Sequence, residues 1–127
     1  MKNASFLLVL FFQLVSAQEL ALVKENNKFG YIATTGSFAI EPKFKDAESF
    51  SEGLAAVNEN GKWGFIDTKG EWIIEPAFSK VKYFNSGVCM VEKDKQWVYI
   101  NKKGEIFKMP VSEKLFDFDG GIAFIRQ

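Results

Sequence analysis

Residues 62–76 read KWGFIDTKGEWIIEP, and residues 28–42 read KFGYIATTGSFAIEP. The two stretches are offset by 34 in residue number, and over the whole repeating unit sixteen positions are identical. Such self-similarity at one fixed spacing is typical of repeat proteins, in which each unit packs on its neighbours. The spacing therefore predicts a tandem array of one small structural unit.

A short apolar segment opens each unit and extends the same spacing along the rest of the chain. The sequence LALV at residues 20–23 returns at this constant offset as LAAV, then as VCMV, and finally as IAFI at residues 122–125. One domain, residues 18–127, is thus predicted to hold three complete units and the start of a fourth. The units are residues 20–53, 54–87 and 88–121, with a partial fourth unit at residues 122–127.

Strands and tight turns account for most of each unit. Asn60-Gly61 accepts the positive φ angles of a two-residue hairpin turn, and Gly70 suits the left-handed position of a three-residue loop. The third strand is expected to end at Pro76, because proline cannot donate to a strand ladder. An apolar connector, residues 78–87, then leads to the next unit. The predicted fold class is all-β, with tandem three-stranded β-meanders that recur at a period of 34 and stack as an open array, either solenoid-like or curved like part of a propeller.

The third unit departs from the pattern. It has Val98 where the other units have glycine, Met109 where they have glutamate, and Ser112 where they have phenylalanine. A terminal repeat has one neighbour instead of two, so this unit is interpreted as a cap.

The phased motif resembles the WG-containing repeat, also called the KWG-type β repeat. The second unit carries Trp63-Gly64-Phe65-Ile66 with Gly70 and Pro76, and the first unit carries a variant in which Phe29 replaces the tryptophan. The resemblance covers residues 20–125. It implies a bacterial and often exported protein whose repeats bind or scaffold other molecules, with no established catalytic residues.

The N-terminus has the features of a cleavable signal peptide. Lys2 is followed by the apolar run FLLVLFF, and Val15-Ser16-Ala17 supplies the small residues of a cleavage site before Gln18. The alternative is a membrane anchor, but the run is much shorter than the roughly 20 apolar residues that span a bilayer. We therefore expect residues 1–17 to be a signal peptide, the protein to reach the periplasm or the extracellular space, and no stable membrane anchor to remain after cleavage.

Composition argues against several classes of function. Loss of residues 1–17 leaves 15 Lys and Arg against 16 Asp and Glu, so no basic excess is present for nucleic acid. The chain has no histidine, which removes His-ligated metal sites and His-dependent catalytic triads. Its one cysteine, Cys89, takes the place of an alanine in the other units and is expected to be a small buried residue. No cofactor, no metal and no catalytic residue is predicted.

Aromatic residues that recur at one phase are predicted to fill the repeat core, because every unit must fill the same space. An exposed row of rings is the alternative. The core set is Phe29, Trp63, Trp97, Phe50, Phe84 and Phe118.

Trp72 is the best candidate for an exposed residue that stacks on a ligand. It follows Glu71, and Phe38 holds the same position in the first unit, so these three residues form the predicted ligand-binding set. The paired carboxylates of Glu75 and Asp67 could serve glycoside hydrolysis, but a turn cap and a strand end explain them more simply.

Three functions stay open on the sequence. The first is a non-catalytic exported module that binds a protein or a component of the cell envelope. The second is a carbohydrate-binding protein that uses exposed aromatic side chains, and the third is a structural spacer or the remnant of a longer array. The sequence does not select the partner.

Overall fold

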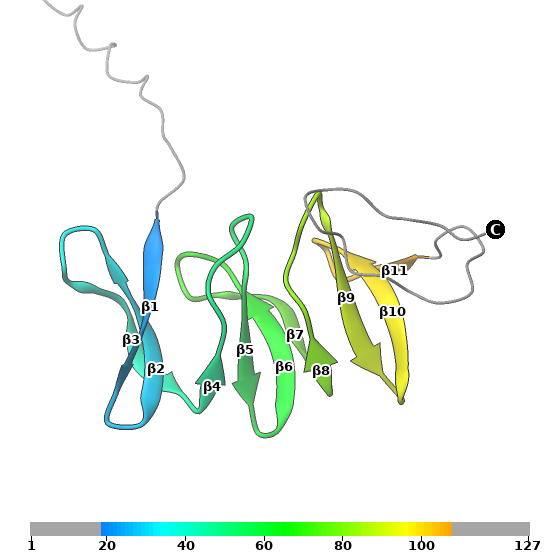
Figure 1. Ribbon diagram of the computed structural model, residues 1–127, viewed down its shortest axis with the longest axis horizontal. Helices are drawn as coiled ribbons and strands as arrows, with labels where there is room; N and C mark the ends of the chain where they lie inside the picture. The colour runs from blue at the N-terminus through cyan, green and yellow to red at the C-terminus, as the bar shows by residue number, and fades with distance from the viewer. Residues whose placement is uncertain (1–18, 108–127) are drawn as a thin grey trace, which may run out of the picture.

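The computed structural model describes residues 19–107, which fold entirely into β-strands and turns (Figure 1). Within this range the strands form three antiparallel sheets that follow one another along the long axis of the molecule. The row does not close on itself, so the predicted all-β open array is confirmed. The strands are β1 (Leu20–Glu25), β2 (Lys28–Ala33), β3 (Phe38–Phe44), β4 (Asp46–Ala47), β5 (Ala55–Glu59), β6 (Lys62–Ile66), β7 (Trp72–Phe78), β8 (Lys80–Val81), β9 (Val88–Lys93), β10 (Gln96–Asn101) and β11 (Ile106–Phe107).

Each unit contributes the predicted three-stranded meander, but the sheets do not coincide with the units. The connector of the first unit forms β4, which pairs with β5 of the second unit. The connector of the second unit forms β8, which pairs with β9 of the third. The sheet orders are therefore β1-β2-β3, β4-β5-β6-β7 and β8-β9-β10-β11. This donated strand, which was not predicted from the sequence, ties consecutive units together through backbone hydrogen bonds.

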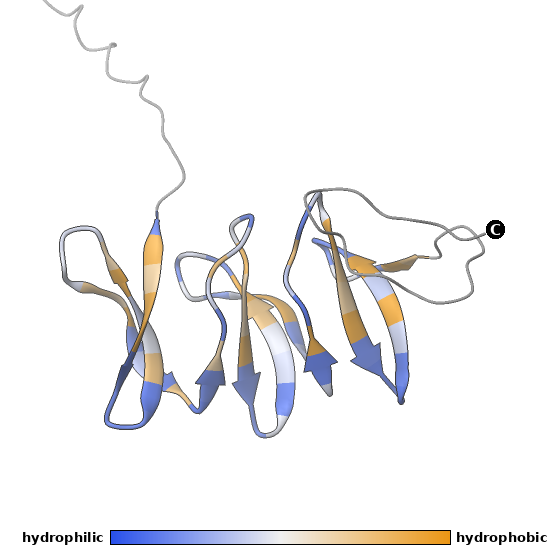
Figure 2. Cartoon of the chain, viewed as in Figure 1, coloured by the Kyte–Doolittle hydropathy of each residue, from blue (hydrophilic) through white to orange (hydrophobic). Residues whose placement is uncertain are grey.

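The hairpin turns have the predicted geometry. Asn60 and Gly61 adopt φ angles of 55° and 87°, and the matching pair Asp94 and Lys95 adopts 54° and 66°. In the next turn Gly70 has a φ of 86°, and its N–H donates to the carbonyl of Asp67 at 2.9 Å. Hydrophilic residues gather at the hairpin tips, at the lower edge of the view in Figure 2, and hydrophobic residues occupy the strands above them.

The prediction that the third strand ends at Pro76 is wrong. Strand β7 continues to Phe78, and β3 likewise passes through Pro42. Trp63 pairs with Phe78 and Phe65 pairs with Ile74, so β7 has extra residues between these two pairs. Proline needs no ladder partner inside such a bulge, and the strand can resume beyond it.

The core lies between units, as the repeat interpretation requires. One cluster joins Tyr31, Ile40 and Phe44 of the first unit to Val57 and Ile66 of the second. A second cluster packs residues of the second unit against three residues of the third, Cys89, Val91 and Ile100. Each unit thus covers the apolar side of the next.

Some sequence predictions concern residues outside the described range 19–107. They are the signal peptide at residues 1–17, the core position Phe118, the substitutions Met109 and Ser112, and the partial fourth unit at residues 122–127. Within the described residues, no helix is present that is long and apolar enough to cross a bilayer.

Candidate functional site

The three residues of the predicted ligand-binding set lie in different environments. Trp72 is half-buried and packs against the core cluster between the first two units, with its ring centroid 6.5 Å from that of Phe44. Glu71 is exposed in the turn before β7, and Phe38 is 40% exposed on another sheet. Trp72 is thus only partly exposed, because the preceding unit lies against it.

The aromatic position beside the WG glycine is neither fully buried nor fully exposed. Phe29, Trp63 and Trp97 are all half-buried. The ammonium of Lys24 lies 5.1 Å from the centroid of the Phe29 ring, and that of Lys82 lies 5.7 Å from the Trp97 ring. Two of these three half-buried rings, Phe29 and Trp97, thus have a lysine ammonium over one face.

The second aromatic position lies in the connector. Phe84 is 1% exposed, and its ring meets that of Phe65 edge-on with centroids 5.0 Å apart. Phe50 makes the equivalent contact with Tyr31 at 4.7 Å but is half-buried. Each connector ring therefore packs on the second strand of its own unit, as a core residue does.

The glycine of the WG motif leaves room for the bulge opposite it. A Cβ atom on Gly64 would lie 2.6 Å from the Ile74 carbonyl oxygen, 2.7 Å from the Pro76 nitrogen and 2.8 Å from the Trp72 ring. A Cβ atom on Gly30 would meet the equivalent backbone of the first unit at 2.6 Å. The spacing of WG to proline therefore encodes one close approach of two strands.

Asp67 has a structural role in its turn. Its Oδ1 atom accepts hydrogen bonds from the backbone N–H groups of Lys69 at 2.9 Å and Glu71 at 3.0 Å. Asn101, which replaces the aspartate in the third unit, accepts the same two bonds from Lys103 and Glu105. Because an amide oxygen serves equally well there, and Ala33 holds the same position in the first unit, this position does not need an acid.

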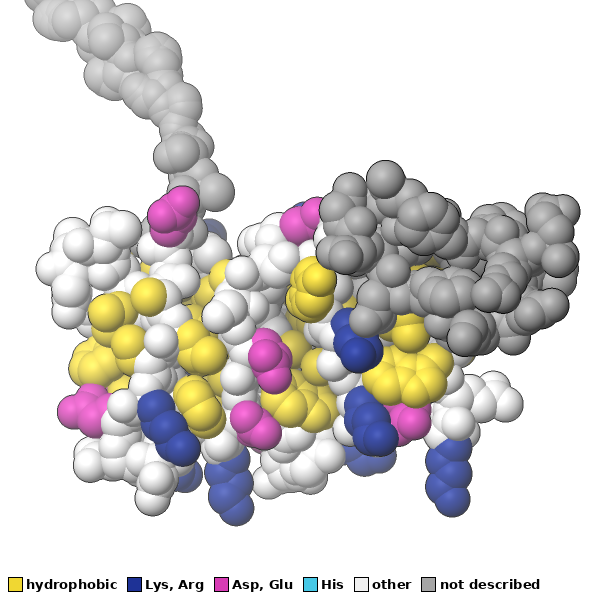
Figure 3. All heavy atoms as spheres, viewed as in Figure 1, with side chains coloured by type: hydrophobic (Ala, Val, Ile, Leu, Met, Phe, Trp, Pro, Cys, Tyr) yellow, Lys and Arg dark blue, Asp and Glu magenta, His cyan; other side chains and the backbone are white. Residues whose placement is uncertain are grey.

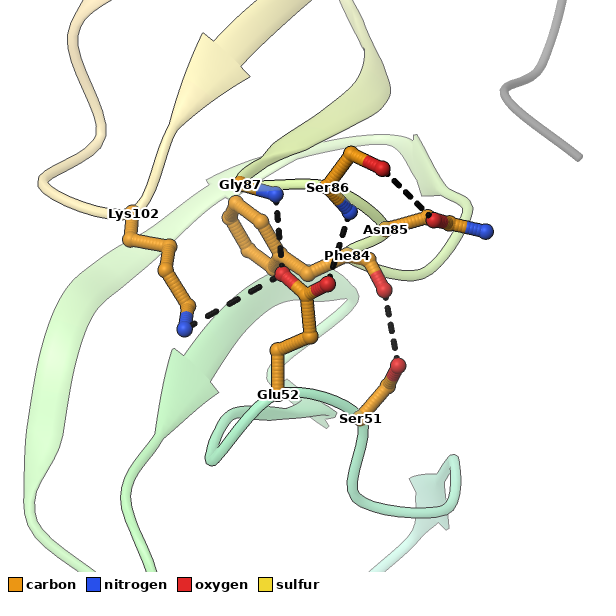
Figure 4. A network of polar contacts seen from close by, with 7 residues as sticks. All are labelled: Ser51, Glu52, Phe84, Asn85, Ser86, Gly87 and Lys102. Atoms are coloured by element: carbon orange, nitrogen blue, oxygen red, sulfur yellow. Dashed lines mark hydrogen bonds and ion pairs between the residues drawn. The ribbon is translucent and has the colours of Figure 1, made fainter. Parts of the chain in front are cut away.

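The junction between the first and second connectors holds a carboxylate that sequence reasoning missed (Figure 4). Glu52 accepts hydrogen bonds from the N–H groups of Ser86, at 2.6 Å, and Gly87, at 2.9 Å, and the ammonium of Lys102 lies 4.0 Å away. The neighbouring Ser51 hydroxyl donates to the Phe84 carbonyl at 2.7 Å. The sequence signal was the pair Glu52-Gly53, which stands at the position of Ser86-Gly87 in the next unit. Glutamate is unusual before such a turn glycine, because the residue there has a positive φ, which is 54° at Glu52.

The remaining reactive groups are enclosed. Cys89 is buried, and its thiol donates to the Met90 carbonyl at 3.4 Å. Burial, with a smaller contribution from the nearby Glu48 carboxylate, raises the pKa of Tyr31 well above its usual value. Residues 19–107 contain no cluster of acidic or cysteine side chains suited to a metal ion.

Among residues 19–107, no element covers the side of the first unit that its successors bury. We call this surface the open end and define it by Ala21, Val23, Ile32 and Phe38. Ala21 is exposed, and Val23 and Ile32 are half-buried. Hydrophobic side chains are visible at this end of the row, on the left in Figure 3. The residues at the equivalent positions of the second and third units are at most 2% exposed. They are Ala55 and Cys89 for Ala21, Val57 and Val91 for Val23, and Ile66 and Ile100 for Ile32.

Comparison with known proteins yields one match. A family model described as WG containing repeat matches three consecutive segments, residues 29–63, 63–97 and 99–127, which together make up more than half of the chain. No curated protein and no solved structure matches the chain.

Proposed function

Because the chain belongs to the family of WG-containing repeat proteins, we propose that it is a non-catalytic exported module that binds a protein or a protein component of the cell envelope. The signal peptide predicted at residues 1–17 would deliver it to the periplasm or the extracellular space. The proposal assigns no chemistry to the module. Its work is recognition by a preformed surface.

The open end is the observation that supports this proposal. Three of its apolar residues, Ala21, Val23 and Ile32, have the same phase as residues that are at most 2% exposed at both internal junctions. Uncovered apolar surface of this kind is a feature of sites where proteins associate. A partner that covered Phe38 and its neighbours would gain the burial that the first unit already provides to the second.

The polar groups also favour binding over catalysis. The carboxylates of Asp67 and Glu52 are engaged in hydrogen bonds with backbone N–H groups, which holds them in structural roles. Trp72, the residue best suited to stack on a sugar, packs at the junction between units. A protein partner therefore suits the surface better than a glycan does.

An affinity experiment tests the proposal. The purified chain is immobilised, exposed to a cell-envelope extract of its own organism, and compared with Phe38→Ser and Ile106→Ser variants. Ile106 is the matched control, since it has the same phase as Phe38, lies in the third unit instead of the first, and is 52% exposed. We expect a protein that is retained by the native chain and by Ile106→Ser but is lost with Phe38→Ser.

Two results would count against the proposal in different ways. Retention of no protein by the native chain would refute the binding function. Equal retention by all three chains would preserve a binding function but remove it from the open end. Mass spectrometry of the N-terminus of the purified chain tests export separately, because cleavage predicts a chain that begins at Gln18.

A further inference from the structure

We propose that the outer edge of β1 accepts an extended segment of a partner protein, in which an acidic residue precedes a small apolar residue and an aromatic residue follows three positions later. This inference rests on the proposed binding function and names the chemistry of the partner. It treats the open end as an unfilled copy of a junction that the array forms twice.

The two internal junctions show how such an edge is filled. At β5, Asp46 pairs with Asn58, Ala47 pairs with Val57, and the N–H of Glu48 donates to the Ala56 carbonyl at 2.8 Å. At β9, Lys80 of β8 pairs with Glu92 and Val81 pairs with Val91. The N–H of Lys82 donates to the Met90 carbonyl at 2.9 Å. Both junctions therefore use one register.

The same edge of β1 carries no strand among residues 19–107. Strand β1 is an edge of its sheet, and Leu22, Val23 and Lys24 are in phase with the residues of β5 that pair with the connector. An exposed strand edge offers unpaired N–H and C=O groups for strand addition. The backbone of β1 can therefore hold a segment in the register seen at β5 and β9.

Charge selects the residue opposite Lys24. At the β9 junction the matching pair is Lys80 opposite Glu92, which places opposite charges face to face. Lys24 is exposed and has the phase of Glu92, so an aspartate or glutamate in the added strand would form the reversed pair. Among the three connectors of this chain, the first has the acidic residue, Asp46, at that position, whereas the second has Lys80 and the third has Lys114.

Apolar side chains of the added segment would cover the open end. Ala47 and Phe50 of the first connector pack into the cluster that encloses Val57 and Ile66. Val81 and Phe84 repeat the spacing in the second connector and pack into the cluster that includes Val91 and Ile100. An alanine or valine followed three residues later by an aromatic ring would therefore lie over Val23, Ile32 and Phe38.

The sequence just before β1 lacks the glycine that the internal junctions use in their turn. Gly53 and Gly87, both with a φ of 82°, complete the hairpin that returns each connector onto the next strand. Glu19 occupies this position ahead of β1. A side chain disfavours that conformation, so we assign the added segment to a second molecule.

A peptide copied from the first connector tests the inference. The probe is a fluorescein-labelled peptide of residues 43–53, KFKDAESFSEG, titrated with the purified full chain and followed by fluorescence anisotropy. We expect saturable binding, together with slower amide hydrogen exchange in β1 and no change in β9. Locating the protection on β1 separates strand addition from adhesion to another surface.

Peptide variants probe each element of the proposed pattern without any risk of unfolding the protein. Glu48→Pro removes the N–H that would donate to the Leu22 carbonyl and should abolish binding. Phe50→Ser should weaken binding about ten-fold or more, because an aromatic ring is no longer buried. Asp46→Lys should weaken it by up to about five-fold, and a Lys24→Glu protein should restore the affinity of that peptide.

The inference would be overturned by absence of saturable binding, by protection outside β1, or by a charge exchange that restores nothing. If the peptide fails while the envelope extract still yields a partner that depends on Phe38, the binding function stands and strand addition is refuted. If both fail, the proposed function is refuted as well.

Discussion

The substitution Gly64→Ala tests whether the WG motif encodes a close approach of two strands. In an ordinary strand, alanine would be more stable than glycine by about 0.5–1 kcal/mol, since glycine loses more backbone entropy on folding. Here the added Cβ atom would lie 2.6 Å from the Ile74 carbonyl oxygen and 2.7 Å from the Pro76 nitrogen. Backbone atoms cannot move aside by a change of rotamer, so the clash should exceed the propensity gain.

The expected cost follows from these opposing effects. Overpacking typically destabilises a protein by about 1–3 kcal/mol, and the rigid partners place this site near the upper value. After the propensity gain is subtracted, Gly64→Ala should lower the free energy of unfolding by about 2 kcal/mol. For a domain of this size, the loss corresponds to a fall in Tm of about 8–16 °C.

Urea denaturation followed by tryptophan fluorescence measures this loss, because the Trp72 ring lies directly over Gly64. Val98→Ala is the matched control, since it keeps a Cβ atom at the same phase of the third unit and should cost about 1 kcal/mol or less. A Gly64→Ala protein as stable as the native chain, or more stable, would refute the explanation of the motif.

Three further predictions concern the junctions. Phe84→Ala should lower the free energy of unfolding by about 3–5 kcal/mol in a urea titration, and Phe50→Ala, at the half-buried copy of the position, should cost clearly less; equal losses would contradict the burial argument. Glu52→Gln should cost about 1 kcal/mol by the same assay, because the side chain keeps one oxygen for two N–H donors, whereas Lys102→Met should change stability by less than about 0.5 kcal/mol. Since burial raises the pKa of Tyr31, the unfolded state loses its proton first, and stability should fall as the pH rises above about 10; a Tyr31→Phe protein that shows the same fall would refute this assignment.

The repeat and its turns could be predicted because their causes are local. Asn60-Gly61 and Gly70 specify backbone conformations that few other residues adopt without cost, and their recurrence fixes the spacing of the strands. Strands β4 and β8 have two residues each, too few to show an alternating pattern. They exist because the neighbouring unit offers an edge, and no pattern within the connector itself carries that information.

The candidate site was less predictable, because residues of equal phase can have different neighbours. Phe38 and Trp72 both begin the third strand of their units, yet Trp72 packs against a preceding unit and Phe38 does not. The sequence predicted that Trp72 would be the exposed residue of this pair, because tryptophan is the more distinctive side chain. A preceding unit does not by itself bury this position, since Ile106 at the same phase of the third unit is 52% exposed, and Phe38 is of interest because it lies beside the other residues of the open end.

The β1 side and the β11 side of the described array differ in chemistry, so the two sides are not equivalent. Val98 puts a side chain at the phase where Gly64 has none, and a Cβ atom on Gly64 would clash with the strand opposite it. Within the described residues, β11 pairs with β10 at Ile106 and Phe107, and its register differs, because Tyr99 pairs with Phe107 whereas the equivalent Phe65 skips Ile73 and pairs with Ile74. Strand β1, in contrast, keeps the backbone register and apolar side chains of an internal junction. A partner that recognises WG-type junctions should therefore distinguish the β1 side from the β11 side.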